Sequence, residues 1–305
     1  LTGSITGKDR EKNNFDFEKN FIHHLSSPLP YRRPKDQTPE QFCDFLVKEF
    51  ENKIEELGSE NVAAFIAEPI LASGGCIVPP EGYYKKIYDV CKRNEIIFIA
   101  DEVVTGFGRL GHFFSSEKVF GVVPDIITCA KGITSGYLPL GAVLFSDKLI
   151  SDLKHDSSLF FHGYTYSGHP ACCAAALKNI EILKRDKILE HVREIEPYFF
   201  DKLNTLYELP IVGDIRGMGL MAGIECVINK DSKEALVLDK AIGSRIDEES
   251  IKLGLIIRPL YHICVLSPAL IITKSQIDDL TEKLYLAISN TIDQLQKEGL
   301  WSNQK

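Results

Sequence analysis

The stretch IIFIADEV (Ile96–Val103) is an apolar run that ends in a carboxylate at Asp101. Two similar runs lie on either side of it along the chain: NVAAFIAE ends at Glu68, and DIITCAKG reaches Lys131. Such runs, joined by amphipathic stretches such as EGYYKKIYDVCKRN (81–94), predict buried parallel strands connected by helices. The sequence therefore predicts an α/β fold whose larger domain contains a mainly parallel sheet.

The charged residues that follow these three runs predict a common site. In an open parallel sheet, ligands bind in the crevice beyond the carboxyl ends of the strands. One charge at a strand end indicates only that the chain surfaces there, whereas Glu68, Asp101 and Lys131 together favour a binding or catalytic site.

A lysine that faces a carboxylate suggests pyridoxal phosphate chemistry. A lysine amine can form a Schiff base with this cofactor, and a carboxylate beside the ring nitrogen keeps that nitrogen protonated. Lys131 and Asp101 fit these two parts. Val103 lies two residues beyond Asp101 and, on a continuing strand, would leave the same face, so we expect it to pack against the ring.

The cofactor also needs a phosphate site, for which HGYTYSGHP (162–170) is the candidate. It offers the hydroxyl of Thr165, two glycines and a helix that begins at Pro170.

The remainder of the chain predicts further elements and a second domain. A helix is expected over Pro39–Leu57, with Phe42, Phe45, Leu46 and Phe50 on its apolar face. From Leu209 the pattern changes to a glycine-rich hairpin, IVGDIRGMGLMAGIEC, followed by a helix near 240–253, the strands GLIIRP and HICVLSP, and a terminal helix. We therefore expect a large domain over 1–208 and a small α+β domain over 209–305.

Composition narrows the classes of partner. The chain has 305 residues and a net charge of −8 without a basic patch, which argues against nucleic acid. No apolar run approaches the roughly 20 residues of a membrane span. The eight cysteines contain no CxxC pair, which predicts reduced thiols and a cytoplasmic location. No metal site is expected, because the adjacent His23 and His24 point in different directions and lack partners at ligand spacing.

Three motifs carry a family resemblance. IADEVVTGFGR (Ile99–Arg109), CAKGITSGYLPLGA (Cys129–Ala142) and FHGYTYSGHPACCAAAL (Phe161–Leu177) resemble the class III aminotransferases, a branch of the fold-type-I pyridoxal-phosphate enzymes. AEPILASGGCIVPPEGY, IRGMGLMAGIE and GLIIRPLYHICVLSPALIIT extend the resemblance over most of the chain from Asn61 onward.

The resemblance implies roles for five residues. Lys131 is similar to the lysine that holds the cofactor as a Schiff base and shuttles a proton, and Asp101 to the partner of the ring nitrogen. Val103 is similar to the residue on the ring face, and Glu68 to a glutamate near the cofactor. Thr165 resembles a threonine that binds the phosphate in the neighbouring subunit's site, which implies a homodimer with shared active sites.

The resemblance also implies a substrate contact. Arg258 is similar to an arginine that binds the substrate carboxylate as a bidentate fork. Ser73 stands where relatives acting on ornithine or 4-aminobutyrate often carry a glutamate, which favours pyruvate as the acceptor. Tyr261 and His262 replace a frequent Gly-Asp pair, so the wall of this pocket differs from the family pattern.

The resemblance leaves the function open among related activities. The leading hypothesis is amino transfer from an ω-amino acid or amine to a keto acid. The alternatives are an aminomutase or a lyase or decarboxylase of the same family, or an inactive fragment. The sequence begins at Leu1, and family members carry over a hundred residues before this point, including a phosphate-gripping loop. We therefore expect an N-terminally incomplete chain, and a targeting segment upstream stays open.

Overall fold

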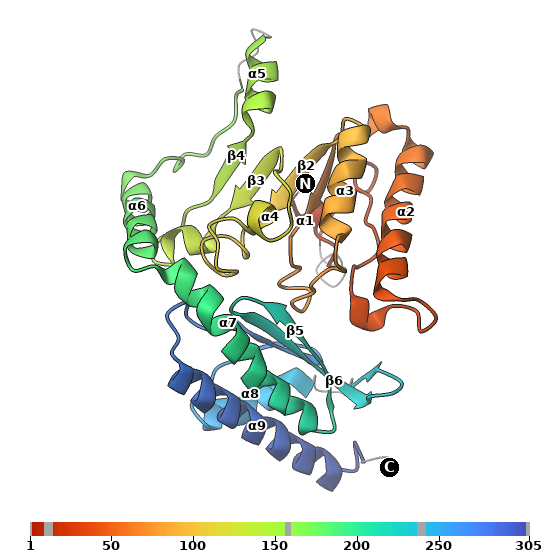
Figure 1. Ribbon diagram of the computed structural model, residues 1–305, viewed down its shortest axis with the longest axis vertical. Coiled ribbons are helices and arrows are strands. Elements are labelled where there is room, and N and C mark those ends of the chain that lie inside the picture. The colour runs from red at the N-terminus through yellow and green to blue at the C-terminus, as the bar shows by residue number, and fades with distance from the viewer. Residues whose placement is uncertain (1, 9–14, 156–159, 237–241, 303–305) are drawn as a thin grey trace. The chain divides into compact units, whose positions relative to one another are not determined.

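The computed structural model describes residues 2–8, 15–155, 160–236 and 242–302 (Figure 1). The chain divides into two compact units, Leu1–Ala63 with Pro79–Ile96, and Ala64–Val78 with Ile97–Lys305. This division does not test the domain boundary expected near Leu209, which stays a prediction.

The first unit contains two contacting helices, α2 (Pro39–Leu57) and α3 (Tyr83–Arg93). A capping box at Thr38 explains why α2 begins where the sequence predicts. The expected apolar face is wrong at one position, because Phe45 is 50% exposed while the neighbouring Cys43 is fully buried. The unit also contains three short helical segments: α1 (Thr2–Ile5), η2 (Pro30–Arg32) and η3 (Ser59–Asn61).

The second unit begins with a four-stranded sheet in the order β1-β2-β3-β4. Its strands are β1 (Ala64–Ala67), β2 (Ile97–Asp101), β3 (Ile126–Cys129) and β4 (Ala142–Phe145). β1, β2 and β3 are parallel, as the apolar runs predict, whereas β4 pairs antiparallel with β3. The α/β expectation is therefore confirmed, with one antiparallel edge strand that was not predicted.

Among the described residues, two short helices lie between strands of this sheet, and three helices and a 3-10 turn lie between β4 and the second sheet. They are α4 (Ser115–Lys118), η4 (Lys131–Thr134), α5 (Asp147–His155), α6 (Pro170–Arg185), α7 (Ile188–Asn204) and η5 (Thr205–Glu208). α6 begins at Pro170 as expected, because proline suits the first helical position.

The second sheet is antiparallel and has the order β5-β6-β9-β8, with β7 paired to β6. Its strands are β5 (Val212–Met218), β6 (Met221–Asn229), β7 (Glu234–Ala235), β8 (Arg258–Leu260) and β9 (Ile263–Leu266). β5 and β6 confirm the predicted glycine-rich hairpin. The expected strand GLIIRP begins later than predicted, at Arg258.

The two faces of the second sheet contact different partners. Helices α7, α8 (Ile242–Lys252) and α9 (Lys274–Lys297) pack along one face (Figure 1). Their shared core includes Phe199, Leu203, Ile246, Leu284, Ile288, Ile224 and Cys264. On the opposite face, Ile263 and Val265 pack with Ile70 and Cys76 from the segment that follows β1.

All eight cysteines are free thiols. None of the helices in the described part of the chain combines the length and apolar character needed to span a membrane.

Candidate active site

The structure brings three of the predicted site residues to one edge of the first sheet. Glu68 directly follows β1, Asp101 is the last residue of β2, and Lys131 comes two residues after β3. Because β1, β2 and β3 are parallel neighbours, their carboxyl ends meet at the same edge. Adjacent strands lie about 4.8 Å apart, so these residues occupy one narrow region.

The side chain of Asp101 forms a hydrogen bond with the backbone two residues further on, where the strand ends. Its Oδ1 accepts a hydrogen bond of 3.0 Å from the backbone N–H of Val103, which turns the chain away from the sheet. Val103 therefore lies in the turn that follows β2, where strand alternation no longer applies, and its packing against the ring stays a prediction. No described group donates a hydrogen bond to Oδ2 of Asp101, so this oxygen is available to a ligand.

A second carboxylate, Glu102, fixes the turn after Asp101. Its side chain is fully buried and accepts hydrogen bonds from Thr105 Oγ1 (2.6 Å), Ser115 Oγ (2.7 Å), Ser116 N (2.7 Å) and Ser116 Oγ (2.5 Å). A buried carboxylate is stable only when such donors replace water. This role was not predicted from the sequence, although the position of Glu102 beside Asp101 was a signal for it.

Lys131 is exposed and sits at a backbone position of unusual geometry. Its φ is 41°, in the left-handed region that residues with a Cβ seldom adopt. Helix α6 fixes the turn that follows, because Asn179 Nδ2 donates to the carbonyl oxygens of Gly132 (2.8 Å) and Ile133 (3.1 Å). Strained backbone that neighbours hold in place is frequent at functional sites.

Thr165 lies in an exposed turn between β4 and α6. Hydrogen bonds from Tyr164 N to Ser167 Oγ (2.9 Å) and from His169 N to Tyr166 O (3.2 Å) shape this turn. Thr165 forms no hydrogen bond with a described residue at the strand ends. The structure therefore does not join Thr165 to Asp101 and Lys131 within one chain.

Arg258 belongs to the second sheet and lies near Cys76, as Glu68 does. It is the exposed first residue of β8. Its charge and that of Glu68 both act on Cys76, whose pKa burial raises to about 12. Arg258 and Glu68 thus share one neighbourhood, although they belong to different sheets.

Arg109, in the motif next to Asp101, links the two sheets. Its guanidinium donates to the carbonyl oxygens of Leu220 and Pro268, both at 2.7 Å. Burial lowers the pKa of Arg109 to about 10. The motif IADEVVTGFGR contains this arginine but does not predict its contacts with Leu220 and Pro268.

Comparisons with known proteins agree with one another. The family model for aminotransferase class-III matches residues 2–288. The putrescine–pyruvate aminotransferase of Pseudomonas aeruginosa is 44% identical over 266 residues, which is 87% of this chain and 58% of that protein. The chain therefore spans little more than half the length of this relative.

Solved structures give the same result. An (S)-enantioselective omega-transaminase from Thermomicrobium roseum has a TM-score of 0.92 and 40% identity, covering 96% of this chain and 65% of that one. The PMP-bound form of an aminotransferase from Vibrio fluvialis has a TM-score of 0.90 and 34% identity, with coverage of 96% and 65%.

Proposed function

Because the chain belongs to the class-III aminotransferases, we propose that it carries the central part of the active site of a transaminase. The reaction moves an amino group from an ω-amino acid or amine to a keto acid. The observation that carries this proposal is the meeting of Asp101 and Lys131 at the carboxyl edge of parallel neighbouring strands. Pyruvate is the proposed acceptor, which the name of the Pseudomonas relative supports.

Class-III aminotransferases use pyridoxal phosphate, and the residues at the strand ends fit this cofactor. Lys131 is exposed and forms no ion pair with a described residue, so its amine is available for a covalent bond. Asp101 keeps Oδ2 available while Val103 N holds Oδ1. When bound, the cofactor acts as the electron sink for the substrate carbon.

The chain's own residues then have distinct tasks. The Asp101 carboxylate holds a proton on the ring nitrogen, and the Lys131 amine binds the cofactor and moves the substrate proton. Val103 packs against the ring and excludes water. Glu68, whose carboxylate accepts a hydrogen bond of 3.0 Å from Ala72 N at the base of the next loop, is the proposed glutamate near the cofactor. Arg258 binds the substrate carboxylate.

We further propose a homodimer in which Thr165 binds the phosphate in the partner subunit's site. Four aromatic residues around Thr165 are highly exposed: Phe160 (64%), Phe161 (94%), Tyr164 (78%) and Tyr166 (80%). Exposed apolar surface of this kind is typical of protein interfaces. The cytoplasmic location stays a prediction, for which the free cysteines are the support.

Borohydride trapping tests the cofactor attachment. The whole protein is loaded with pyridoxal phosphate, reduced with borohydride and digested, and the modified peptide is identified by mass spectrometry. We expect the modification on Lys131 and its loss in Lys131→Ala. A modification on another lysine contradicts the proposed site.

A donor-only incubation separates amino transfer from its alternatives. With putrescine or β-alanine alone, a transaminase converts its cofactor to the pyridoxamine form once and stops. An aminomutase, lyase or decarboxylase continues to consume the donor, and an inactive fragment leaves the cofactor unchanged. We expect a single conversion, followed by renewed turnover when pyruvate is added.

A further inference from the structure

The loop between Leu71 and Ile77 has a fixed backbone. Leu71 and Ile77 exchange two backbone hydrogen bonds of 3.0 and 3.1 Å. Ala72 N donates to the Glu68 carboxylate, and Cys76 N donates to Ala72 O at 3.0 Å. The loop therefore starts from the site edge of β1 and holds Ser73 between these contacts.

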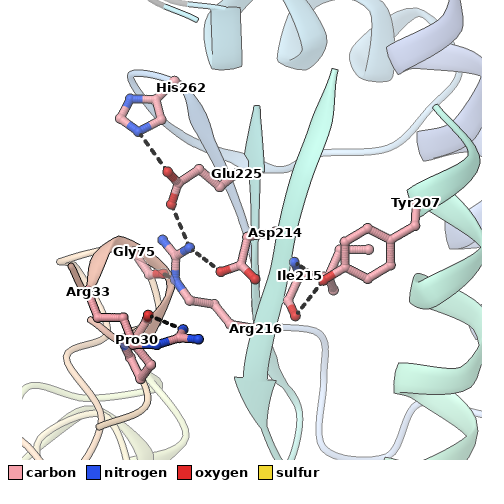
Figure 2. Close-up of polar contacts among 9 residues, drawn as sticks. All are labelled: Pro30, Arg33, Gly75, Tyr207, Asp214, Ile215, Arg216, Glu225 and His262. Carbon is pink, nitrogen blue, oxygen red and sulfur yellow. Dashed lines mark hydrogen bonds and ion pairs between the residues drawn. The ribbon is translucent and has the colours of Figure 1, made fainter. Parts of the chain in front are cut away.

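The other side of the loop docks on the second sheet through Gly75. Arg216 Nε donates a hydrogen bond of 2.8 Å to the carbonyl oxygen of Gly75 (Figure 2). A Cβ on Gly223 would lie 2.6 Å from that same oxygen, and a Cβ on Gly75 would lie 2.7 Å from Cδ1 of Ile263. The close approach of the loop to the sheet therefore requires glycine at both positions, and Gly75 also has a φ of +110°.

Two carboxylates hold the arginine that makes this contact. Arg216 Nη1 lies 2.7 Å from Asp214 Oδ2 and 2.6 Å from Glu225 Oε2, and Figure 2 shows both carboxylates pointing toward the guanidinium. The arginine side chain is 8% exposed and that of Glu225 is 1% exposed. A buried arginine is stable only with such partners, so its charge is balanced and its direction is fixed.

The register of the sheet places Arg216 in one row with Arg258. Arg216 pairs with Gly223, Gly223 with Val265, and Val265 with Arg258. Three strand spacings separate the two arginines, which is about 14 Å. Gly75 lies over Gly223 in this row, between the buried Arg216 and the exposed Arg258. Cys76, the next residue, feels the charge of both arginines.

We propose that Arg216 is a positioning residue, which seats the loop Leu71–Ile77 on this row and so fixes Ser73 relative to Arg258. The inference rests on the proposed function, in which Arg258 binds the carboxylate of the keto acid. Since Asp214 and Glu225 balance the charge of Arg216, Arg258 is the arginine of this row that is open to a substrate.

The thiol of Cys76 reports on the seating of the loop. Cys76 is fully buried and its pKa is raised to about 12, so it reacts with iodoacetamide only when the loop leaves the sheet. Arg216→Lys keeps the charge but cannot bond Gly75 and both carboxylates in one fork. We expect Cys76 labelling in the cofactor-loaded protein to become about tenfold faster, because a charge-assisted hydrogen bond no longer opposes opening. Peptide mass spectrometry assigns the label, and the half-buried Cys173 serves as internal reference.

Two further variants separate seating from a general loss of stability. Gly223→Ala leaves every charge in place but sets a methyl group against Gly75 O, so it should also accelerate labelling. Arg245→Lys is the control, because Arg245 is 17% exposed and pairs with Glu298 at 2.9 Å, outside the row. We expect Arg245→Lys to label Cys76 at the wild-type rate.

Steady-state kinetics test the link to the substrate. In Arg216→Lys we expect the KM for pyruvate to rise about fivefold or more, while the KM for a carboxylate-free amine and kcat change by less than about twofold. Unchanged labelling of Cys76 overturns the proposal. Faster labelling with equal effects on both substrates also overturns it, because Arg216 is then only structural. If the wild-type protein shows no amino transfer, the proposed function is wrong. The labelling rate of Cys76 still decides whether Arg216 holds the loop.

Discussion

Asn179 donates a hydrogen bond of 2.8 Å to the carbonyl oxygen of Gly132, so helix α6 holds the turn that begins with Lys131. A second bond, to Ile133 O, comes from the same amide nitrogen. This side chain thus supports a lysine whose backbone is in the left-handed region.

Asn179→Ala should weaken both the fold and the turn that carries Lys131. Two carbonyl oxygens lose the Asn179 amide, although Gly132 O keeps the hydrogen bond from Ser135 N, and we expect the free energy of unfolding to fall by about 1–2 kcal/mol. The loosened turn should reduce kcat about tenfold. Urea unfolding and steady-state kinetics measure the two effects. Asn290→Ala, in helix α9, is the control and should leave kcat unchanged; a normal kcat in Asn179→Ala would show that the turn does not need this support.

Asp101→Asn should remove the charge that holds the ring proton. The amide oxygen can still accept the hydrogen bond from Val103 N, so the turn should persist. We expect kcat to fall by about two orders of magnitude or more, with little change in Tm. Asp125→Asn makes the same chemical change at a carboxylate that accepts from Phe98 N, and it should spare kcat. Near-normal turnover in Asp101→Asn would mean that Asp101 is only a strand-end charge.

Glu102→Gln should destabilise the turn beside the site. All the groups around the Glu102 carboxylate are hydrogen-bond donors, and the NH2 group of glutamine cannot accept from them. We expect the free energy of unfolding to fall by about 1–3 kcal/mol. Chemical denaturation measures this loss. Glu117→Gln is the matched control, because the side chain of Glu117 is 60% exposed. Equal stability of the two variants would contradict the role assigned to Glu102.

Arg258→Ala should affect the keto acid more than a diamine donor. A bidentate charged contact contributes about 1.5–3 kcal/mol, which corresponds to a rise in KM for pyruvate of about 10- to 150-fold. Putrescine carries no carboxylate, so its KM should stay within about threefold. Parallel increases for both substrates would show that Arg258 is structural.

Cys76 should contribute to alkaline unfolding. Its thiol has a pKa of about 12 in the folded state against an ordinary value of 9.0, so the unfolded chain loses this proton first. The protonated Cys76 thiol therefore contributes its full stabilisation of the folded state below pH 9, and this contribution is lost between pH 9 and 12. In that range the wild type should lose up to about 1.4 kcal/mol more per pH unit than Cys76→Ala. Thermal unfolding across this range measures the difference, and parallel curves for the two proteins would refute the assignment.

The sequence predicts the three parallel strands because local patterns determine them. The three apolar runs ending at Glu68, Asp101 and Lys131 identify parallel strands, and parallel strands share an edge. The position of Val103 could not be predicted in the same way. β2 ends at Asp101, whose side chain accepts a hydrogen bond from Val103 N, and the alternation of strand residues does not predict this turn.

Contacts between residues far apart in the sequence could not be predicted from local patterns. Arg216 and Gly75 are 141 positions apart, and nothing in the text IRGMG indicates which carbonyl its arginine will meet. The strand β4 was also missed. Val143 and Leu144 in this strand are 54% and 41% exposed. Burial in the core of this sheet therefore does not explain why these residues are apolar.

The loop that holds Ser73 is anchored almost entirely by backbone atoms: the N–H of Ala72, the carbonyl of Gly75 and the paired groups of Leu71 and Ile77. The side chain at position 73 takes no part in these anchors. A single substitution there can therefore change the side chain beside the site while the backbone stays in place. We therefore expect position 73 to accept substitutions that alter substrate preference without lowering the stability of the fold.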